Sequence, residues 1–161
     1  MYNRRAINNL REWKKSINRK PLVLRGARQV GKTTLVRMFS KEFSQFIELI
    51  LERPEHKSLF ETDRSFDELI TAIFFLAKKQ KNIANTLIFI DEIQNSPAAV
   101  AHLRFFYEDT PQYAVIAAGS MLESLIDRHI SFPVGRVEYL AIRPCSFYEY
   151  LEAHGELESV V

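Results

Sequence analysis

Residues 26–33 read GARQVGKT, a glycine-rich stretch that matches the pattern G-x-x-x-x-G-K-[ST] at every fixed position. In such a loop, backbone N–H groups point inward and the next helix presents its N-terminus, which solvates the clustered charges of a polyphosphate. Gly26 and Gly31 allow tight turns and close approach of the backbone. The motif therefore predicts a nucleotide triphosphate site, with Lys32 on the β- and γ-phosphates and Thr33 on a Mg²⁺ ion.

The residues on either side of this loop have the order that the motif requires. Before it, residues 21–24 (PLVL) form a short apolar run typical of a buried strand. After it, Leu35, Met38 and Phe39 recur at helical spacing. We therefore predict a strand, a phosphate loop and a helix. The residues predicted to contact the nucleotide are Gly26, Ala27, Arg28, Gln29, Val30, Gly31, Lys32, Thr33 and Thr34.

A second part of the same site is predicted where another apolar run ends. Residues 86–90 (TLIFI) are of strand type and are followed by Asp91 and Glu92. Ligands of open α/β sheets collect at the carboxyl ends of strands, so both carboxylates should lie beside the loop. The segment looks like a Walker B element, in which Asp91 holds Mg²⁺ and Glu92 orients or deprotonates the attacking water.

Two further residues are candidates for the catalytic machinery. Ser120 follows a third strand candidate, residues 113–118, and could act as a sensor of the γ-phosphate, as the N-cap of the next helix, or as both. Arg136 precedes the strand-like run 137–142 and is the first candidate for an arginine that neutralises transition-state charge, ahead of Arg128. Both arginines have an alternative interpretation as ordinary surface residues.

The composition is that of an ordinary globular domain: 161 residues, 47% hydrophobic and 26% charged. No run approaches the roughly 18 apolar residues of a membrane span, and the N-terminus lacks the apolar core of a secretory signal. The single cysteine, Cys145, excludes an internal disulfide and fits a reducing cytoplasm. The four histidines lack metal-ligand spacing and are expected at the surface; they are His56, His102, His129 and His154.

Residues 1–20 carry an excess of positive charge, with seven basic residues against Glu12 alone. Their spacing predicts an amphipathic helix with its apolar side on the core. The apolar positions are Ile7, Leu10, Trp13 and Ile17. The basic face is interpreted either as a solvated surface or as a patch for the phosphate backbone of a nucleic acid.

Strand and helix patterns alternate along the chain, which favours a parallel sheet with helices on both faces. The predicted strands are 21–25, 45–51, 86–91, 112–118 and 137–142. The predicted helices are 2–18, 32–43, 66–80, 97–108, 120–127 and 146–153, and a short helix is expected to open at Pro54. Residues 74–76 (FFL) are expected in the core.

With both nucleotide motifs in place, the chain resembles the AAA-superfamily ATPases of bacteria and archaea. The stretches that carry the resemblance are LVLRGARQVGKTTLVRMF (22–39), LIFIDEIQ (87–94), VIAAGSMLES (115–124) and VGRVEYLAIRPCSFYEYL (134–151). The resemblance implies a three-layer α/β P-loop NTPase core with a mainly parallel five-stranded sheet of the additional-strand, catalytic-glutamate type. It also implies ATP and Mg²⁺ as ligands, Asp91 and Glu92 as the Walker B pair, and Ser120 as the sensor. Arg136 matches a Gly-Arg of the family pattern to which no role is assigned.

Family members generally continue into a helical lid and a separate C-terminal domain. Residues 1–161 are therefore expected to be the core alone, either as a fragment or as a stand-alone core, with residues 1–20 as its basic N-terminal helix. The resemblance implies a cytoplasmic protein of prokaryotic type that acts on an unknown protein partner. An oligomer is compatible with it.

The function expected from the sequence is Mg-dependent binding and hydrolysis of ATP, slow in isolation, that drives or gates a partner. The first alternative is a nucleotide-gated or DNA-binding module without significant turnover. A small-molecule kinase would use the same loop, but residues 50–85 show no clear acceptor pocket. A GTPase is disfavoured because no [NT]-K-x-D signature occurs in the chain.

Overall fold

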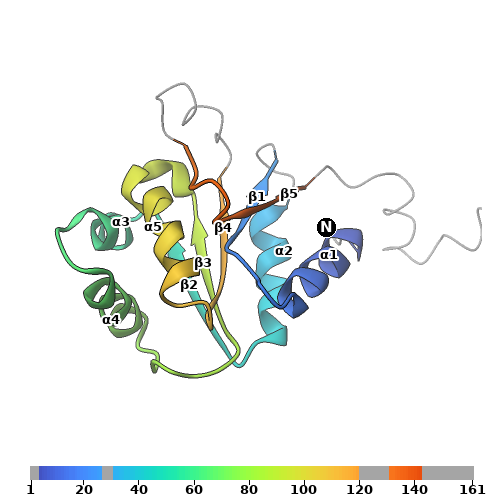
Figure 1. The fold of residues 1–161 in the computed structure, drawn as a ribbon, viewed down its shortest axis with the longest axis horizontal. Coiled ribbons are helices and arrows are strands. Elements are labelled where there is room, and N and C mark those ends of the chain that lie inside the picture. The colour runs from blue at the N-terminus through green and yellow to red at the C-terminus, as the bar shows by residue number, and fades with distance from the viewer. Residues whose placement is uncertain (1–3, 27–30, 120–130, 143–161) are drawn as a thin grey trace, which may run out of the picture.

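A computed structural model describes residues 4–26, 31–119 and 131–142, which form a sheet between two layers of helices (Figure 1). The five strands, in their order across the sheet, are β2 (Gln45–Ile50), β3 (Thr86–Asp91), β4 (Ala114–Ala118), β1 (Leu22–Arg25) and β5 (Glu138–Ala141). All four neighbouring pairs are parallel. Strand β4 lies between β1 and β3, so the predicted three-layer P-loop NTPase fold with an additional strand is confirmed.

Helices cover both faces of this sheet. On one face lie α1 (Arg4–Lys15) and α2 (Lys32–Phe39), which continues into the 3-10 turn η1 (Ser40–Glu42). On the other face lie α3 (Pro54–Glu61), α4 (Phe66–Ala77) and α5 (Pro97–Glu108), with the 3-10 turn η2 (Ile93–Asn95) between β3 and α5. No helix in the described ranges has the length and apolar character that a membrane span requires.

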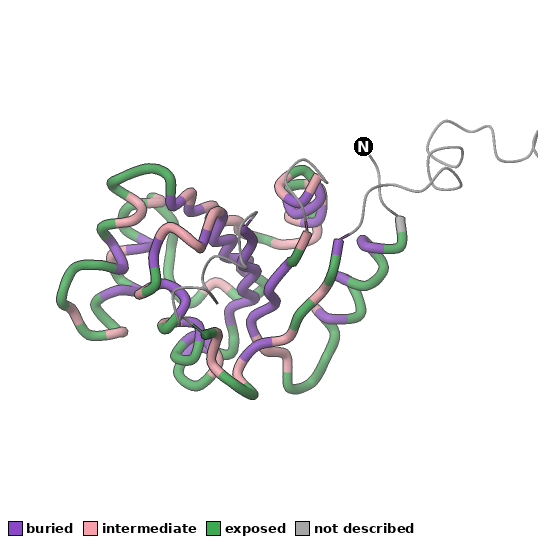
Figure 2. The backbone as a smooth tube through the Cα atoms, turned by 90° about the horizontal axis from the view of Figure 1, so that it is seen from above, coloured by how far each residue is buried: buried purple, intermediate pink, exposed green. Residues whose placement is uncertain are grey.

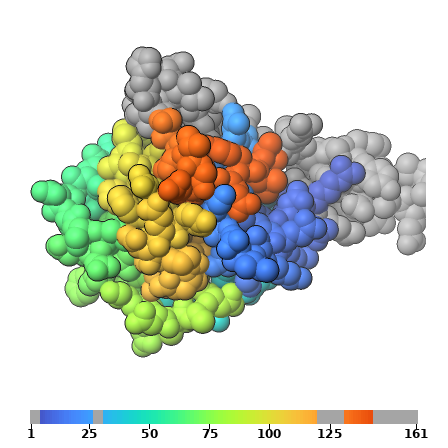
Figure 3. Space-filling view, in the orientation of Figure 1, coloured from blue at the N-terminus to red at the C-terminus, as the bar shows by residue number. Residues whose placement is uncertain are grey.

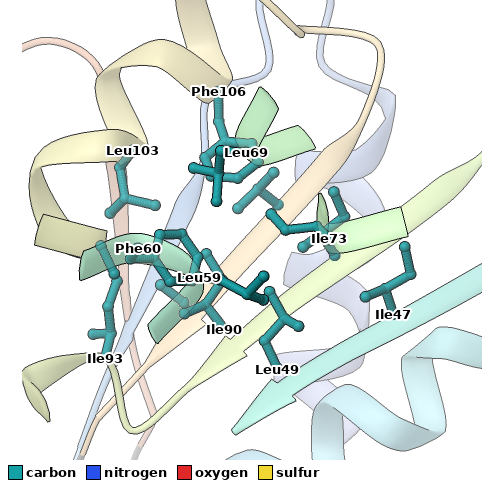
Figure 4. Close-up of a cluster of buried hydrophobic side chains, with 14 of the residues drawn as sticks. Ile47, Leu49, Leu59, Phe60, Leu69, Ile73, Ile90, Ile93, Leu103 and Phe106 are labelled. Carbon is teal, nitrogen blue, oxygen red and sulfur yellow. The ribbon is translucent and has the colours of Figure 1, made fainter. Parts of the chain in front are cut away.

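The central strands separate two hydrophobic cores, because successive side chains of a strand point to opposite faces. In β3, Ile88 and Ile90 join the core under α3, α4 and α5, whereas Leu87 and Phe89 join the core under α1 and α2. Figure 4 shows the first of these cores, where side chains of α3, α4 and α5 meet those of β2 and β3. Every residue of β3 and β4 is buried (Figure 2), as expected for strands covered on both faces.

Where the predicted and observed elements differ, the difference lies at the ends of helices and, by one or two residues, at the ends of strands. Strand 86–91 and helix 97–108 have the predicted bounds. Helix α4 ends three residues early, because Lys78 adopts a left-handed conformation (φ 57°) that closes the helix. The predicted helices 120–127 and 146–153, and Cys145, lie outside the described residues.

Five predictions about individual side chains are wrong, those for Ile17, Phe75, Leu76, His56 and His102. Leu76, predicted in the core, is 39% exposed, and His102, predicted at the surface, is half-buried. Ile17 follows the end of α1 and is 98% exposed, so it does not belong to the buried apolar face. Phe74 is buried as predicted, but Phe75 is 84% exposed because the next residue of a helix points about 100° away. His56 is half-buried rather than at the surface, and its Nδ1 accepts a hydrogen bond from the backbone N–H of Ile50 at 2.8 Å.

Candidate functional site

The glycine at the end of the predicted phosphate loop starts helix α2. Gly31 is the N-cap residue and has φ 86°, a left-handed conformation that side chains disfavour. A Cβ at this position would meet no atom within 4 Å, so backbone conformation rather than crowding favours glycine. The Gly31 carbonyl then accepts the first helical bond, from Leu35 N–H at 2.9 Å. The predicted contact residues 27–30 lie outside the described part of the chain.

The N-terminus of α2 has the properties of an anion site. The first N–H groups of a helix have no partner within the helix, and the helix dipole is positive at this end. Gly31 has no side chain with which to cap them, and the first turn, which includes Thr33 and Thr34, contains no acidic residue. This end of α2 is therefore suited to bind an oxyanion.

Lys32 places an ammonium group close to the start of the loop. The residue is only 8% exposed, and its Nζ donates a hydrogen bond of 2.7 Å to the carbonyl of Gly26. A buried ammonium needs negatively polarised partners. The bond connects the first glycine of the loop with the helix that follows the loop, so the positive charge lies where phosphate oxygens are expected.

A hydrogen bond links the loop helix to the end of β3. Thr33 Oγ1 donates to Asp91 Oδ2 at 2.9 Å. The contact joins residues that follow or end two strands that are not neighbours, because β4 lies between β1 and β3. It brings together a hydroxyl and a carboxylate oxygen, the hard oxygen ligands that Mg²⁺ prefers.

The electrostatic environment of Asp91 favours a bound cation. Burial raises the pKa of Asp91, and the negative charges of Glu92 and Glu48 raise it further. The hydrogen bonds from Thr33 and from the Glu92 backbone act in the opposite direction. A desolvated carboxylate near other acidic groups gains from a neighbouring positive charge, so the site fits Mg²⁺.

The described part of the chain supplies few ligands for such an ion. Within the described ranges, His, Cys, Asp and Glu form no group of three or more that could hold a metal ion. In nucleotide sites, Mg²⁺ usually keeps several waters and binds one or two protein groups together with phosphate oxygens.

Glu92 lies in a tight turn directly after β3. Its backbone is left-handed (φ 55°, ψ 47°), and its N–H donates to Asp91 Oδ1 at 2.9 Å. Its carboxylate accepts a hydrogen bond from Gln94 Nε2 at 2.5 Å. Sequence reasoning missed Gln94, although its position two residues after Glu92, between the predicted strand 86–91 and the predicted helix 97–108, was a usable signal.

The structure does not bring Arg136 to this site. Glu138, two residues later, pairs with Leu22, the first residue of β1, so Arg136 lies at the edge where the strands begin. The loop leaves the opposite edge, roughly 10 Å away along β1. Arg136 Nε instead donates to Glu108 Oε1 at 3.1 Å, and in Figure 3 the orange segment before β5 lies beside the yellow helix α5. Ser120 and Arg128 lie outside the described residues.

Several basic side chains of the N-terminal region contact the protein itself. Arg11 forms an ion pair with Glu42 at 2.8 Å, and Lys14 donates to the Glu42 carbonyl at 2.7 Å. Arg19 is partly buried, which lowers its pKa, and donates to the carbonyls of Pro111 and Gln112. These contacts attach α1 and the segment after it to the core, and they fix the positions of three of the seven basic side chains of residues 1–20.

A glycine-initiated helix, a buried lysine and a Thr–Asp contact at the carboxyl edge of a parallel sheet define a P-loop nucleotide-binding core. Residues 18–151 match the family described as AAA domain, and the chain belongs to that family. No curated protein matches the chain significantly.

Two solved structures are similar in fold. The Walker-type ATPase of Pyrococcus abyssi is 18% identical with a TM-score of 0.60, and the match covers 100% of this chain and 59% of that protein. The Aeropyrum pernix ORC1 protein, solved in complex with DNA, is 16% identical with a TM-score of 0.53, covering 95% of this chain and 48% of that one. This chain therefore spans less than two thirds of the length of either protein.

Proposed function

We propose that this chain binds ATP with Mg²⁺ and hydrolyses it to ADP and phosphate, and that this cycle drives or gates a partner protein. The observation that carries the proposal is the 2.9 Å contact between Thr33 and Asp91, beside the buried ammonium of Lys32. It joins the two motifs that phosphate and metal binding require. Membership of the AAA domain family supports the same activity.

Each residue has a distinct task in this proposal. Lys32 and the N–H groups at the start of α2 bind phosphate oxygens, and Thr33 and Asp91 hold the metal. When bound, Mg²⁺ supplies charge that neutralises the phosphate oxygens. Glu92, next to Asp91 at the end of β3, accepts a proton from the attacking water.

Slow turnover is expected for the isolated chain. The described residues place no arginine of the β5 region at the carboxyl edge, where Arg136 was expected to act. Charge stabilisation by an arginine can be worth about 10³–10⁵ in rate. A partner protein or a neighbouring copy that supplies such a group would accelerate the reaction.

The experiment is to measure MgATP binding and release of free phosphate by the purified chain, with no phosphate acceptor added. The parent should bind and release phosphate, Lys32→Ala should lose binding, and Glu92→Gln should bind but turn over about 10²–10⁴ times more slowly than the parent. Lys79→Ala, which alters a lysine at an exposed position, is the matched control and should behave as the parent. Phosphate transfer only with an added acceptor would support a kinase and contradict this proposal.

A DNA arm of the same experiment tests the main alternative. Arg11, Lys14 and Arg19 are engaged with the protein, so we expect added DNA to leave turnover and ATP affinity unchanged. Tight DNA binding that falls steeply with salt, without ATP hydrolysis, would support a nucleic-acid module instead.

A further inference from the structure

Gln94 makes a direct contact with the proposed general base. Its Nε2 donates to Glu92 Oε2 at 2.5 Å, and the Glu92 carboxylate is half-buried. The orientation of the amide follows from chemistry: reversing it would place a carbonyl oxygen against a carboxylate oxygen, where neither atom has a proton to donate. The contact is therefore a charge-assisted hydrogen bond from amide to carboxylate.

The backbone that carries Gln94 is held on both sides. Ile93 is fully buried in the core under α3, α4 and α5. Ser96 is also fully buried, and its Oγ accepts a hydrogen bond from Ala99 N–H at 3.1 Å, which caps α5. Within the turn, Asn95 N–H donates to the Glu92 carbonyl at 3.1 Å. The amide of Gln94 thus projects from a fixed turn rather than from a free loop.

The carbonyl oxygen of the same amide makes no stabilising hydrogen bond with the described residues. Gln94 Oε1 is buried, and among the described residues it is the one buried side-chain polar atom that has no hydrogen-bond partner. Burying an acceptor without a partner destabilises a fold. A methionine has a similar length and would fill the same space without that cost. The glutamine is therefore better explained by its contact with Glu92 than by packing.

We propose that Gln94 is a positioning residue for ATP hydrolysis, which rests on the function proposed above. Its N–H fixes the orientation of the Glu92 carboxylate and occupies Oε2, so that Oε1 is the oxygen left to accept a proton. In the reaction, the water oxygen forms a new bond to the γ-phosphorus while a water proton passes to Glu92. The bond from that phosphorus to the β–γ bridging oxygen breaks, and ADP leaves with the electron pair.

The first test is the variant Gln94→Met, which removes the N–H and keeps the side-chain length. We expect kcat to fall at least about fivefold, and by no more than in Glu92→Gln, because a general base is worth about 10²–10⁴ in rate. The Kd for MgATP and the melting temperature should not worsen. Gln112→Met, at an exposed position, is the matched control and should leave all three quantities unchanged.

A double variant separates positioning from a structural role. If Gln94 acts through Glu92, Gln94→Met should have no further effect on turnover once Glu92→Gln is present. An equal fold-loss in both backgrounds would overturn the proposal, as would an unchanged or faster turnover in Gln94→Met alone. A parent that binds MgATP but releases no phosphate would instead contradict the proposed function.

A second readout does not depend on activity. In ¹⁵N NMR spectra, the side-chain NH₂ of Gln94 can be assigned as the pair that disappears in Gln94→Met. We expect its hydrogen exchange with water to be slow in the parent and clearly faster in Glu92→Ala, because the acceptor is then missing. Exchange that Glu92→Ala leaves unchanged would overturn the proposed contact, whatever the turnover.

Discussion

At the scale of single residues, the site depends on a few polar contacts whose geometry requires particular side chains. Thr33 needs a hydroxyl that can reach Asp91, and Lys32 needs a chain long enough to reach the Gly26 carbonyl. Glu92 adopts a left-handed backbone that non-glycine residues rarely use, and its N–H bonds to Asp91 Oδ1. Backbone strain of this kind, about 1–3 kcal/mol, is common at functional sites.

Removing the hydroxyl of Thr33 tests its proposed role as a metal ligand. Thr33→Val keeps the shape of the side chain and should weaken MgATP binding at least about tenfold, while ATP binding without Mg²⁺ changes little. Isothermal titration calorimetry with and without Mg²⁺ measures both affinities. Thr71→Val, on the exposed side of α4, is the control. Equal losses with and without Mg²⁺ would show that Thr33 does not act through the metal.

Arg136 gives a prediction about pH. Its hydrogen bond is the main cause that lowers the pKa of Glu108, so Arg136→Ala should raise that pKa, with Arg104 still bonded to Glu108. NMR titration of the Glu108 side chain measures the shift. A carboxyl group whose pKa is lowered by folding stabilises the fold at pH values above the pKa that it has in the unfolded chain. This contribution is lost as the pH falls through the lowered pKa of the folded state. The variant should hydrolyse ATP as the parent does; a large loss of turnover would place Arg136 in the site after all.

At the scale of elements, chain chemistry sets where helices begin and end. Helix α4 begins with a capping box between Ser65 and Glu68, and α5 begins with the Ser96 cap followed by Pro97. The C-terminal end of α4 depends on Lys78, which takes the left-handed conformation that glycine adopts more readily.

This helix end offers a stability prediction. Lys78→Gly should raise the free energy of unfolding by about 0.5–1 kcal/mol, because glycine adopts the left-handed conformation without strain. Urea denaturation measures the change. Lys79→Gly, one residue further, does not replace a strained residue and should not stabilise. A gain at both positions would show that the conformation of Lys78 is not the cause.

Local patterns predicted the elements well where sequence and packing agree. Strand 86–91 and helix 97–108 were predicted with their observed bounds, because an uninterrupted apolar run and a Ser-Pro start are strong local signals. The burial of Ile17 and the position of Arg136 were predicted wrongly. The end of α1 and the pairing of β5 with β1 depend on contacts between distant parts of the chain. The contact of Gln94 with Glu92 likewise needed the fold of the turn.

At the scale of the whole molecule, the sheet connects parts of the site that are far apart in the chain. Thr33 and Asp91 are separated by 58 positions, yet they meet because β1 and β3 are parallel strands on either side of β4. Parallel strands bring their carboxyl ends to one edge, which is where ligands of such sheets bind. The two helical layers and the buried strands β3 and β4 hold this edge in place.

Ligand binding should therefore stabilise the entire fold. At a concentration 100 times its Kd, MgATP should add about 2.7 kcal/mol to the free energy of unfolding, because it binds only the folded chain. Thermal melts with increasing MgATP measure this effect. Lys32→Ala should melt at a temperature independent of MgATP, whereas Lys79→Ala should respond as the parent does. An equal rise in Lys32→Ala would mean that ATP binds elsewhere.

The central claim is that Lys32, Thr33 and Asp91 act on one metal-bound polyphosphate. The most direct test is ATP affinity as a function of Mg²⁺ in the parent and in Asp91→Asn, which preserves size and removes the charge. We expect Mg²⁺ to strengthen ATP binding in the parent and to have little effect in Asp91→Asn. An undiminished effect of Mg²⁺ in Asp91→Asn would contradict this claim.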